Sequence, residues 1–207
     1  MAKEKIEIDK LKYEKEEEQK GHFLIAGVDE VGRGPLAGPV CVACVIMPLD
    51  DIIEGVDDSK KVSEKKRKLL FEQIKEKAVA YSIEMVDEQT IDSINILQAT
   101  KLCMKKAIEN LGLKPDVVLV DAISSLDIDV PIRGIVKGDA LSYSIGCASI
   151  LAKVTRDEYM VKLAEEYPEY GFDKHKGYGT KVHIEALKEY GPCVYHRLSF
   201  LKFLEEK

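Results

Sequence analysis

The stretch HFLIAGVDEVGRGPLAGPVCVACVIM, residues 22–47, decides the fold class. Its two apolar runs, 22–28 and 40–47, predict buried strands, and the glycine- and proline-rich turn EVGRGPLAGP between them predicts a hairpin. A helix capped by Ser63 is expected next, followed by AYSIEMV at 80–86, which is rich in strand-forming residues. We therefore expect three strands in succession.

The second half of the chain alternates helical and apolar segments. An amphipathic helix is expected over 87–111, followed by the buried strand DVVLVDA at 116–122 and the shorter strand IRGIV at 132–136. A long helix is expected over 140–166, with two shorter helices after it. This order predicts an α/β fold with a mixed central sheet flanked by helices and a helical C-terminal region.

Residues 1–20 differ in composition from the rest of the chain. They alternate Lys and Glu with few large apolar residues, which predicts a charged extension, helical or disordered, that no core retains. Its deletion is expected to change activity little. Residues 21–207 are expected to form one domain. The chain has no apolar run long enough for a membrane span or a secretory signal, so we expect a cytoplasmic protein.

Cysteine usage and charge limit the classes of function. The five cysteines are odd in number and mostly lie in apolar surroundings, which indicates reduced core residues; the CxxC spacing of Cys41 and Cys44 lacks a second ligand pair for zinc. The net charge of −6 argues against nucleic-acid binding by bulk electrostatics. Contacts to nucleic acid would require the local basic patches 59–68 and 173–181, each of which is equally consistent with a solvated surface.

Four acids fall at the ends of apolar segments. Asp29 and Glu30 follow the run FLIAGV, Asp121 follows VVLV, and Asp139 precedes the helix expected from Ala140. Ligands bind at the carboxyl ends of strands in α/β sheets, and crowded carboxylates need cations, for which oxygen ligands favour Mg²⁺ or Mn²⁺. The pattern indicates a two-metal phosphodiester site. For any single acid, an ordinary cap of a strand end or helix start remains an alternative.

Seven segments, found in one consistent order after residue 22, carry a family resemblance. They are GVDEVGRGPLAGPV (27–40), DSKKVSEKKR (58–67), LVDA (119–122), KGDA (137–140), ASILAKVTRDEYM (148–160), HKGYGTKVH (175–183) and GPCVYHRLSF (191–200). Together they resemble ribonuclease HII, the type 2 ribonuclease H family.

The resemblance implies a ribonuclease H-like fold and a monomeric endoribonuclease. Such an enzyme hydrolyses the RNA strand of RNA–DNA hybrids and nicks duplex DNA 5′ of single ribonucleotides, leaving 3′-hydroxyl and 5′-phosphate ends, in ribonucleotide excision repair and DNA replication. Its cofactor would be Mg²⁺ or Mn²⁺, with two ions during catalysis, held by Asp29, Glu30, Asp121 and Asp139. A replication clamp is a conceivable partner that no feature of the sequence supports.

The resemblance also assigns substrate contacts. Gly32, Arg33 and Gly34 would read the 2′-hydroxyl, and Tyr178 would pack against the sugar beside the scissile phosphate. Phosphates would be contacted by four basic residues: Lys60, Lys61, Lys153 and Arg156. Three roles are open for His175 and His196, namely proton shuttling, phosphate binding and hydrogen bonding to the backbone.

Two other functions stay open. One is a different metal-dependent nuclease of the same fold, acting on DNA or on junctions. The other is a catalytically silent module that binds hybrids. Retention of all four acids argues against the silent module, because a binder of polyanions has no use for clustered carboxylates unless metals bridge them.

Overall fold

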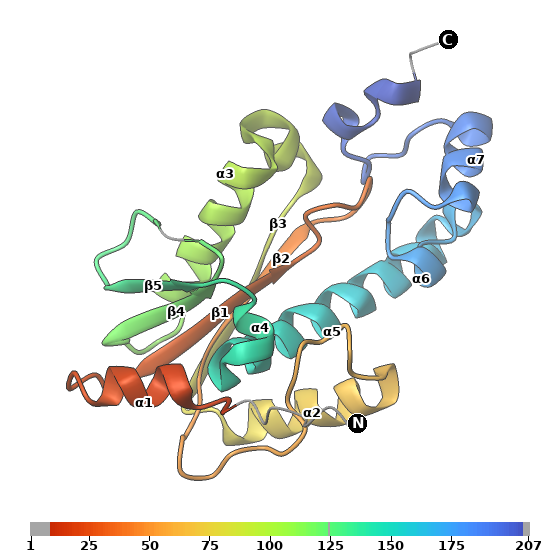
Figure 1. Cartoon of the computed structure of the whole chain (residues 1–207). Coiled ribbons are helices and arrows are strands. Elements are labelled where there is room, and N and C mark those ends of the chain that lie inside the picture. The colour runs from red at the N-terminus through yellow and green to blue at the C-terminus, as the bar shows by residue number, and fades with distance from the viewer. Residues whose placement is uncertain (1–8, 124, 205–207) are drawn as a thin grey trace, which may run out of the picture.

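A five-stranded mixed sheet forms the centre of the computed structural model, which describes residues 9–123 and 125–204 (Figure 1). Its strands are β1 (Ile25–Val31), β2 (Val40–Ile46), β3 (Ala80–Val86), β4 (Val117–Asp121) and β5 (Ile132–Ile135). They lie in the order β3-β2-β1-β4-β5. β1 pairs antiparallel with β2, and β2 with β3, whereas β4 and β5 continue the sheet in parallel. The predicted hairpin and mixed sheet are confirmed.

Helices cover both faces of this sheet and form the C-terminal region (Figure 1). The α-helices are α1 (Lys12–Glu18), α2 (Glu64–Lys77), α3 (Glu88–Glu109), α4 (Gly138–Leu141), α5 (Tyr143–Glu166), α6 (Phe172–His175) and α7 (Lys181–Tyr190). Short 3-10 turns are η1 (Pro168–Tyr170), η2 (Leu198–Phe200) and η3 (Lys202–Leu204). Within the described residues, no helix combines the length and hydropathy needed to cross a membrane.

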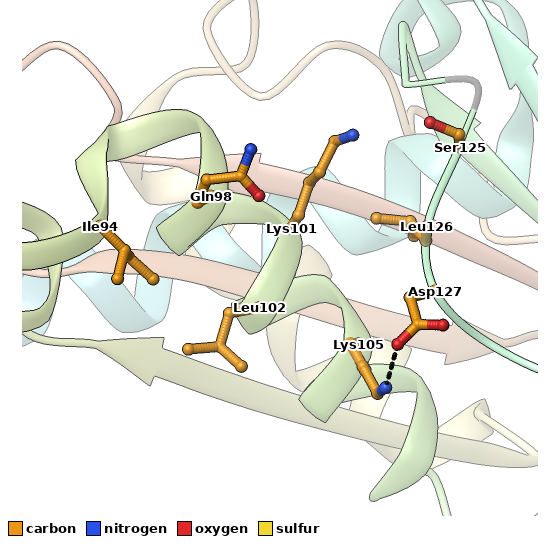
Figure 2. Close-up of a pocket in the computed structure, with 8 residues that line it drawn as sticks. All are labelled: Ile94, Gln98, Lys101, Leu102, Lys105, Ser125, Leu126 and Asp127. Atoms are coloured by element: carbon orange, nitrogen blue, oxygen red, sulfur yellow. Dashed lines mark hydrogen bonds and ion pairs between the residues drawn. The ribbon is translucent and has the colours of Figure 1, made fainter.

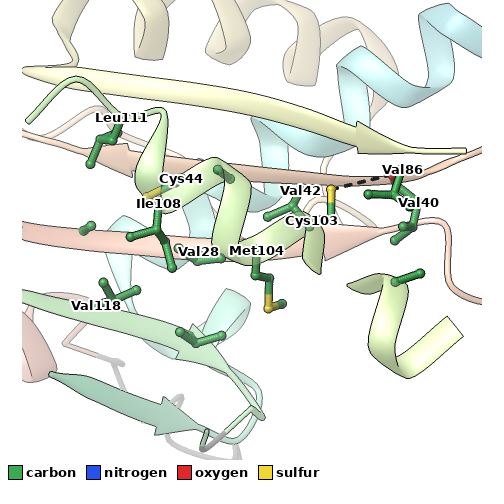
Figure 3. Close-up of a cluster of buried hydrophobic side chains, with 14 of the residues drawn as sticks. Val28, Val40, Val42, Cys44, Val86, Cys103, Met104, Ile108, Leu111 and Val118 are labelled. Carbon is green, nitrogen blue, oxygen red and sulfur yellow. Dashed lines mark hydrogen bonds between the residues drawn. The ribbon is translucent and has the colours of Figure 1, made fainter. Parts of the chain in front are cut away.

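The core is divided by the sheet into two layers. Alternate residues of the strands, such as Val28, Val42 and Val118, pack with Met104 and Ile108 of α3 on one face (Figure 3). The intervening residues of β2 pack against α2 and α5 on the other face. Burial on both faces explains why the sequence of β2 is an unbroken apolar run instead of an alternating one.

α5 approaches β1 so closely that Gly27 has no room for a side chain. A Cβ atom at this position would lie 2.2 Å from the backbone carbon of Ser144. The first turns of α5 include the small residues Ser144, Gly146 and Ala148, and the helix packs against β1 and β2 (Figure 1). This packing carries Ser149 and Lys153 of α5 to the end of β1 where the acids lie.

Two predicted boundaries differ from the structure. β1 runs through Asp29 and Glu30, which therefore belong to the strand and do not follow it. The helix expected over 140–166 is broken at Ser142, whose extended backbone (φ −117°, ψ 132°) separates α4 from α5. Ser142 caps α5 by accepting a hydrogen bond from the amide of Ile145 at 3.2 Å. Asp139 consequently sits inside α4.

The prediction that nothing retains the N-terminal extension is wrong for its described part, from residue 9 onward. Glu14 of α1 is completely buried, and its Oε1 accepts hydrogen bonds from Ser142 Oγ (2.6 Å) and Ser144 N (2.9 Å). Arg133 of β5 pairs with Glu17 at 2.8 Å. Polar contacts dock this helix, so the missing apolar stripe was a poor guide. Residues 1–8 lie outside the described residues.

Candidate active site

The register of the two central strands places two acids side by side. β1 and β4 run parallel with Val28 opposite Val120, so Asp29 and Asp121 are the next residues on neighbouring strands. Asp121 Oδ1 accepts a hydrogen bond from Gly138 N at 2.8 Å, which draws the start of α4, with Asp139, to the end of β4. Segments far apart in the sequence thus converge at one edge of the sheet.

All four predicted acids line one cavity of about 310 Å³. Its other lining residues are Val31, Ser59, Lys60, Ser149, Lys153 and Tyr178. Of the predicted phosphate contacts, Lys60 and Lys153 are therefore at the cavity. Lys61 is exposed nearby and lies 3.8 Å from Asp58. Ser59 and Ser149 were not singled out from the sequence, although both lie inside the quoted motifs, and a hydrogen bond of 2.9 Å joins their hydroxyls.

Burial, together with neighbouring carboxylates, raises the affinity of three of the acids for protons. Burial, followed by the nearby Glu30, raises the pKa of Asp29 well above its usual range. Burial also raises the pKa of Glu30, against the effect of Arg33. The pKa of Asp139 is raised by burial and by Asp58. Asp58, which sequence reasoning missed, is thus a further carboxyl group close to Asp139 beside the cavity.

The chemistry of these donors fits a hard divalent cation. All four groups offer carboxylate oxygens, and Glu30 Oε2 is buried without a hydrogen-bond partner. Asp29 and Asp121 each use Oδ1 for a backbone amide, at 2.8 Å in both cases, which leaves the second oxygen for a ligand. Among the described residues, however, no three His, Cys, Asp or Glu side chains are placed to hold one metal ion together.

The turn after β1 carries the predicted glycine–arginine–glycine motif. Gly32 has a φ of +94°, and a Cβ there would lie 2.2 Å from Arg156 Nε, so only glycine fits. Gly34 differs, because the nearest atom to a Cβ would be Tyr178 Cε1 at an ordinary 3.7 Å. Arg33 is exposed, with its guanidinium 3.4 Å from Glu30 Oε1. The motif and Tyr178 are therefore neighbours.

Arg156 does not make the predicted phosphate contact, because its side chain is fully buried. Its three guanidinium nitrogens donate to backbone carbonyls, those of Pro39 (2.8 Å), Lys176 (3.0 Å) and Ala37 (3.1 Å). Because the side chain is buried, the guanidinium has no exposed surface to offer a phosphate. Arg156 instead ties the turn after β1 to the loop that carries Tyr178.

Arg197, which sequence reasoning missed, holds the same turn from the other end of the chain. Its guanidinium, also fully buried, donates to the carbonyls of Gly32 (2.6 Å), Arg33 (3.0 Å) and Gly38 (2.6 and 2.9 Å). Burial, together with the neighbouring Arg156, lowers the pKa of Arg197 to about 9. The group remains a cation at neutral pH, which strengthens its hydrogen bonds to carbonyls.

The last three predicted residues, Lys153, His175 and His196, all make hydrogen bonds or ion pairs within the protein. Lys153 is half-buried and pairs with Asp157 at 2.7 Å, and burial lowers its pKa. His175 Nε2 lies 2.7 Å from the carbonyl oxygen of Tyr170, and His196 Nδ1 lies 3.0 Å from the amide of Cys193. Of the three roles left open for these histidines, backbone hydrogen bonding is the one seen.

A larger cavity, of about 710 Å³, lies between α3 and the loop after β4 (Figure 2). It is lined by Ile94, Gln98, Lys101, Leu102, Lys105, Ser125, Leu126 and Asp127. Its single acid, Asp127, is already paired with Lys105 at 2.8 Å. Chemistry, not volume, therefore selects the smaller cavity as the candidate active site.

Comparisons with known proteins show the family and the fold. The family model "Ribonuclease HII" matches residues 26–203. A ribonuclease HII from Caldicellulosiruptor bescii is 59% identical over 182 residues, which are 88% of each chain. The solved ribonuclease H2 of Pyrococcus horikoshii has a TM-score of 0.73 and 29% identity, covering 88% of this chain and 97% of its own. A ribonuclease HII solved with PCNA from Archaeoglobus fulgidus has a TM-score of 0.74 and 27% identity, covering 85% and 94%.

Proposed function

Since the chain belongs to the ribonuclease HII family, and is thus a ribonuclease H acting on RNA–DNA hybrids, we propose a more specific reaction. The enzyme also nicks duplex DNA 5′ of a single embedded ribonucleotide, leaving 3′-hydroxyl and 5′-phosphate ends. The observation that carries this proposal is the sharing of one cavity by four carboxylates and Tyr178, with the Gly32–Gly34 turn beside it.

The carboxylates support hydrolysis at the phosphate. Asp29, Glu30, Asp121 and Asp139 would hold the Mg²⁺ or Mn²⁺ ions on which this metal-dependent family relies. Two such ions would lower the pKa of an attacking water and stabilise the leaving oxygen. The protein's own part is to present acceptor oxygens in fixed positions, which the backbone bonds to Asp29 and Asp121 achieve.

Gly34 supports selectivity for the sugar. Space for a Cβ exists at this position, so the fold alone does not require glycine there. The position is exposed beside Tyr178, where a bare backbone lets a ribose approach closely. We infer that the turn reads the 2′-hydroxyl, while the exposed ring of Tyr178 packs against the adjacent sugar.

Basic residues around the cavity would fix the register of the substrate. Lys60, Lys61 and Lys153 supply cations on the side of the cavity formed by the loop before α2 and by α5. These contacts would be independent of base sequence. The four acids, Lys60, Lys153 and Tyr178 converge within a single fold, and we propose that the enzyme acts as a monomer.

The setting of the enzyme follows from other features. The free cysteines, four of them buried, suit a reducing compartment such as the cytoplasm, where we propose that the enzyme acts in ribonucleotide repair and replication.

Besides nucleic acid, a replication clamp is a second candidate partner, because the Archaeoglobus relative was solved with PCNA. Leu198 and Phe203 are exposed near the end of the chain. Co-elution with the host's clamp would test this pairing.

Three duplexes test the proposed reaction: one with a single ribonucleotide, one with a continuous RNA strand and one that is all DNA. With Mg²⁺ we expect a single nick 5′ of the ribonucleotide in the first duplex and cleavage within the RNA strand of the second. The all-DNA duplex should give no product. Without a divalent ion no duplex should be cut. Equal cutting of the all-DNA duplex would overturn the ribonuclease assignment in favour of a general nuclease, and absence of cutting would leave a silent binding module.

Two glycine variants test the role of the turn. Gly34→Ala should keep the melting temperature of the wild type but lose at least about tenfold in cleavage, because a methyl group would meet the ribose. Gly32→Ala is the matched control, and its strained backbone and clash with Arg156 should lower the melting temperature. Normal cleavage by Gly34→Ala would remove the turn from sugar recognition.

A further inference from the structure

A buried pair of histidines in the C-terminal region takes no part in the active site described above. His183 of α7 is 0% exposed and His196 is 2% exposed. Their Nε2 atoms lie 3.0 Å apart, and aromatic rings, including those of Tyr170 and Phe172, surround them. Neither histidine reaches the cavity. His183 does, however, bind the backbone carbonyl of Tyr178, a residue that lines this cavity.

The hydrogen bonds of this pair have only one consistent direction. His183 Nδ1 lies 2.9 Å from the carbonyl oxygen of Tyr178, which can only accept, so His183 must carry its proton on Nδ1. Its bare Nε2 must then accept a proton from His196 Nε2. His196 Nδ1 is left to accept the amide proton of Cys193 at 3.0 Å.

Both imidazoles are neutral in this arrangement. A second proton on either ring would place two N–H groups against each other, or one against the Cys193 amide. Burial, followed by the neighbouring His183, lowers the pKa of His196 to about 4, in agreement with this reasoning. The result is a directed chain of hydrogen bonds from Cys193 through His196 and His183 to Tyr178.

The loop at the end of this chain is fixed along its length. Besides the bond from His183, the Tyr178 carbonyl accepts one from Thr180 N at 2.8 Å. Arg156 binds the carbonyl of Lys176, and Leu36 N donates to that of Gly177 at 2.8 Å. With its backbone held in this way, the exposed ring of Tyr178 stands at a set distance from Gly34.

We propose that His196 is a positioning residue, which acts through His183 on the Tyr178 carbonyl and thereby sets selectivity at the RNA-to-DNA junction. The proposal rests on the function proposed above, in which Tyr178 packs against the sugar beside the cut. A ring that senses one missing hydroxyl must be placed to a fraction of an ångström, and the His183 side chain binds the carbonyl of Tyr178 itself, whereas Thr180 ties the loop to α7 two residues later. The competing account is that the pair merely packs the core.

Two substitutions separate the two ends of His196. In His196→Gln the side-chain amide reaches His183 but loses the bond from Cys193, whereas His196→Asn keeps an acceptor for Cys193 and is too short for His183. We expect His196→Asn to lose about tenfold in kcat at a single ribonucleotide while KM and cleavage of continuous RNA stay near wild type. His196→Gln should retain selectivity to within about twofold.

A double-mutant cycle then shows whether the effect passes through Tyr178. In the Tyr178→Ala background, His196→Asn should have no further effect, because no ring remains to be placed. An additive effect, or equal loss on both substrates, would overturn the proposal in favour of core packing. If Tyr178→Ala alone leaves junction cleavage unchanged, the role proposed for Tyr178 fails and this inference fails with it.

A spectroscopic measurement on the unaltered protein covers the case in which the variants do not fold. Long-range ¹H–¹⁵N correlation spectra of the histidine side chains report which nitrogen carries the proton. We expect His183 protonated on Nδ1 and His196 on Nε2, with both rings neutral at pH 7. Protonation of His183 on Nε2 would overturn the proposed chain directly.

Discussion

At the strand ends, Asp29 and Asp121 each give one carboxylate oxygen to a backbone amide, and Glu30 keeps a buried oxygen without a partner. In the turn that follows β1, by contrast, the carbonyls of Gly32 and Gly38 are bound by Arg197. The acids therefore retain lone pairs for a ligand. In the turn, these carbonyls are held by the protein itself, while the exposed backbone at Gly34 stays open to the approach of a ribose.

These two regions should respond differently to substitution. Crowded carboxylates repel one another, so removing one charge relieves the fold while harming the chemistry. Buried carbonyls that lose their donor have no water to replace it, so removing a supporting side chain harms the fold first. Stability and turnover are thus assigned to neighbouring residues of one site.

Asp121→Asn is expected to have the largest effect on activity. The amide keeps an oxygen for the bond from Gly138 but loses the charge that holds a cation. Loss of several kcal/mol of transition-state stabilisation should reduce kcat about a thousandfold. The melting temperature without metal should be unchanged or higher. Near-normal kcat in Mg²⁺ would remove Asp121 from the catalytic set.

Arg197→Met is expected to have the largest effect on stability. It leaves carbonyls of Gly32, Arg33 and Gly38 buried without their donor, and the free energy of unfolding should fall by about 3 kcal/mol. Arg33→Ala is the matched control in the same turn, because Arg33 is exposed, and it should cost under about 1 kcal/mol. Urea unfolding measures both. Equal losses would mean that burial of the guanidinium is unimportant.

The four acids could be located from the sequence because each follows or interrupts a local pattern. Apolar runs of strand length end at Asp29 and Asp121, and parallel neighbours bring such ends together. The hairpin could be predicted for the same reason, from two apolar runs around a glycine-rich turn. What remained out of reach was the split at Ser142, since a serine that caps α5 is compatible with a helix interior too.

Buried polar contacts were the features that sequence patterns concealed. Arg156 looked like a surface base beside Lys153, although its spacing of four residues from Ala152 and Met160 places it on the buried stripe of α5. Arg197 has no such signal in its loop. The docking of α1 through Glu14 depends on partners that come from residues 142 and 144, far along the chain. Composition alone cannot report such pairings.

The dependence of stability on pH should have opposite signs at the acids of the cavity and at the buried histidine pair. Burial lowers the pKa of His196 to about 4, so the folded state binds fewer protons than the unfolded state, whose histidine titrates near 6.5. The contribution of His196 to the free energy of unfolding is therefore complete above pH 6.5 and is lost as the pH is lowered toward 4. Asp29, whose pKa burial raises, contributes the opposite slope, because the folded state binds the additional proton.

His196→Asn tests this pH dependence. The groups facing His196 are His183, His175, Tyr170 and Cys193, all of which the variant keeps. Between pH 6.5 and 4, the metal-free variant should lose about 2 kcal/mol less unfolding free energy than the wild type. Asp29→Asn should steepen the loss instead. Parallel curves for His196→Asn and wild type would show that His196 is not held neutral.

Glu14→Gln is expected to have the smallest effect. This variant tests whether the contacts of α1 help to hold Asp139 in place. Glu14 Oε1 binds Ser142 Oγ and Ser144 N at the start of α5, directly after the helix that carries Asp139. The variant keeps an acceptor oxygen there but removes a negative charge from a helix N-terminus, which should cost about 1 kcal/mol in the free energy of unfolding.

Because α1 contributes no residue to the cavity, the KM of Glu14→Gln should be unchanged. Its kcat should fall by about twofold, because Asp139 is held less firmly. Glu18→Gln on the exposed side of the same helix is the control and should match the wild type. If both variants behave alike in urea unfolding and in turnover, α1 is the dispensable extension that composition predicted, and the placement of the acids depends on the sheet and on α4 without it.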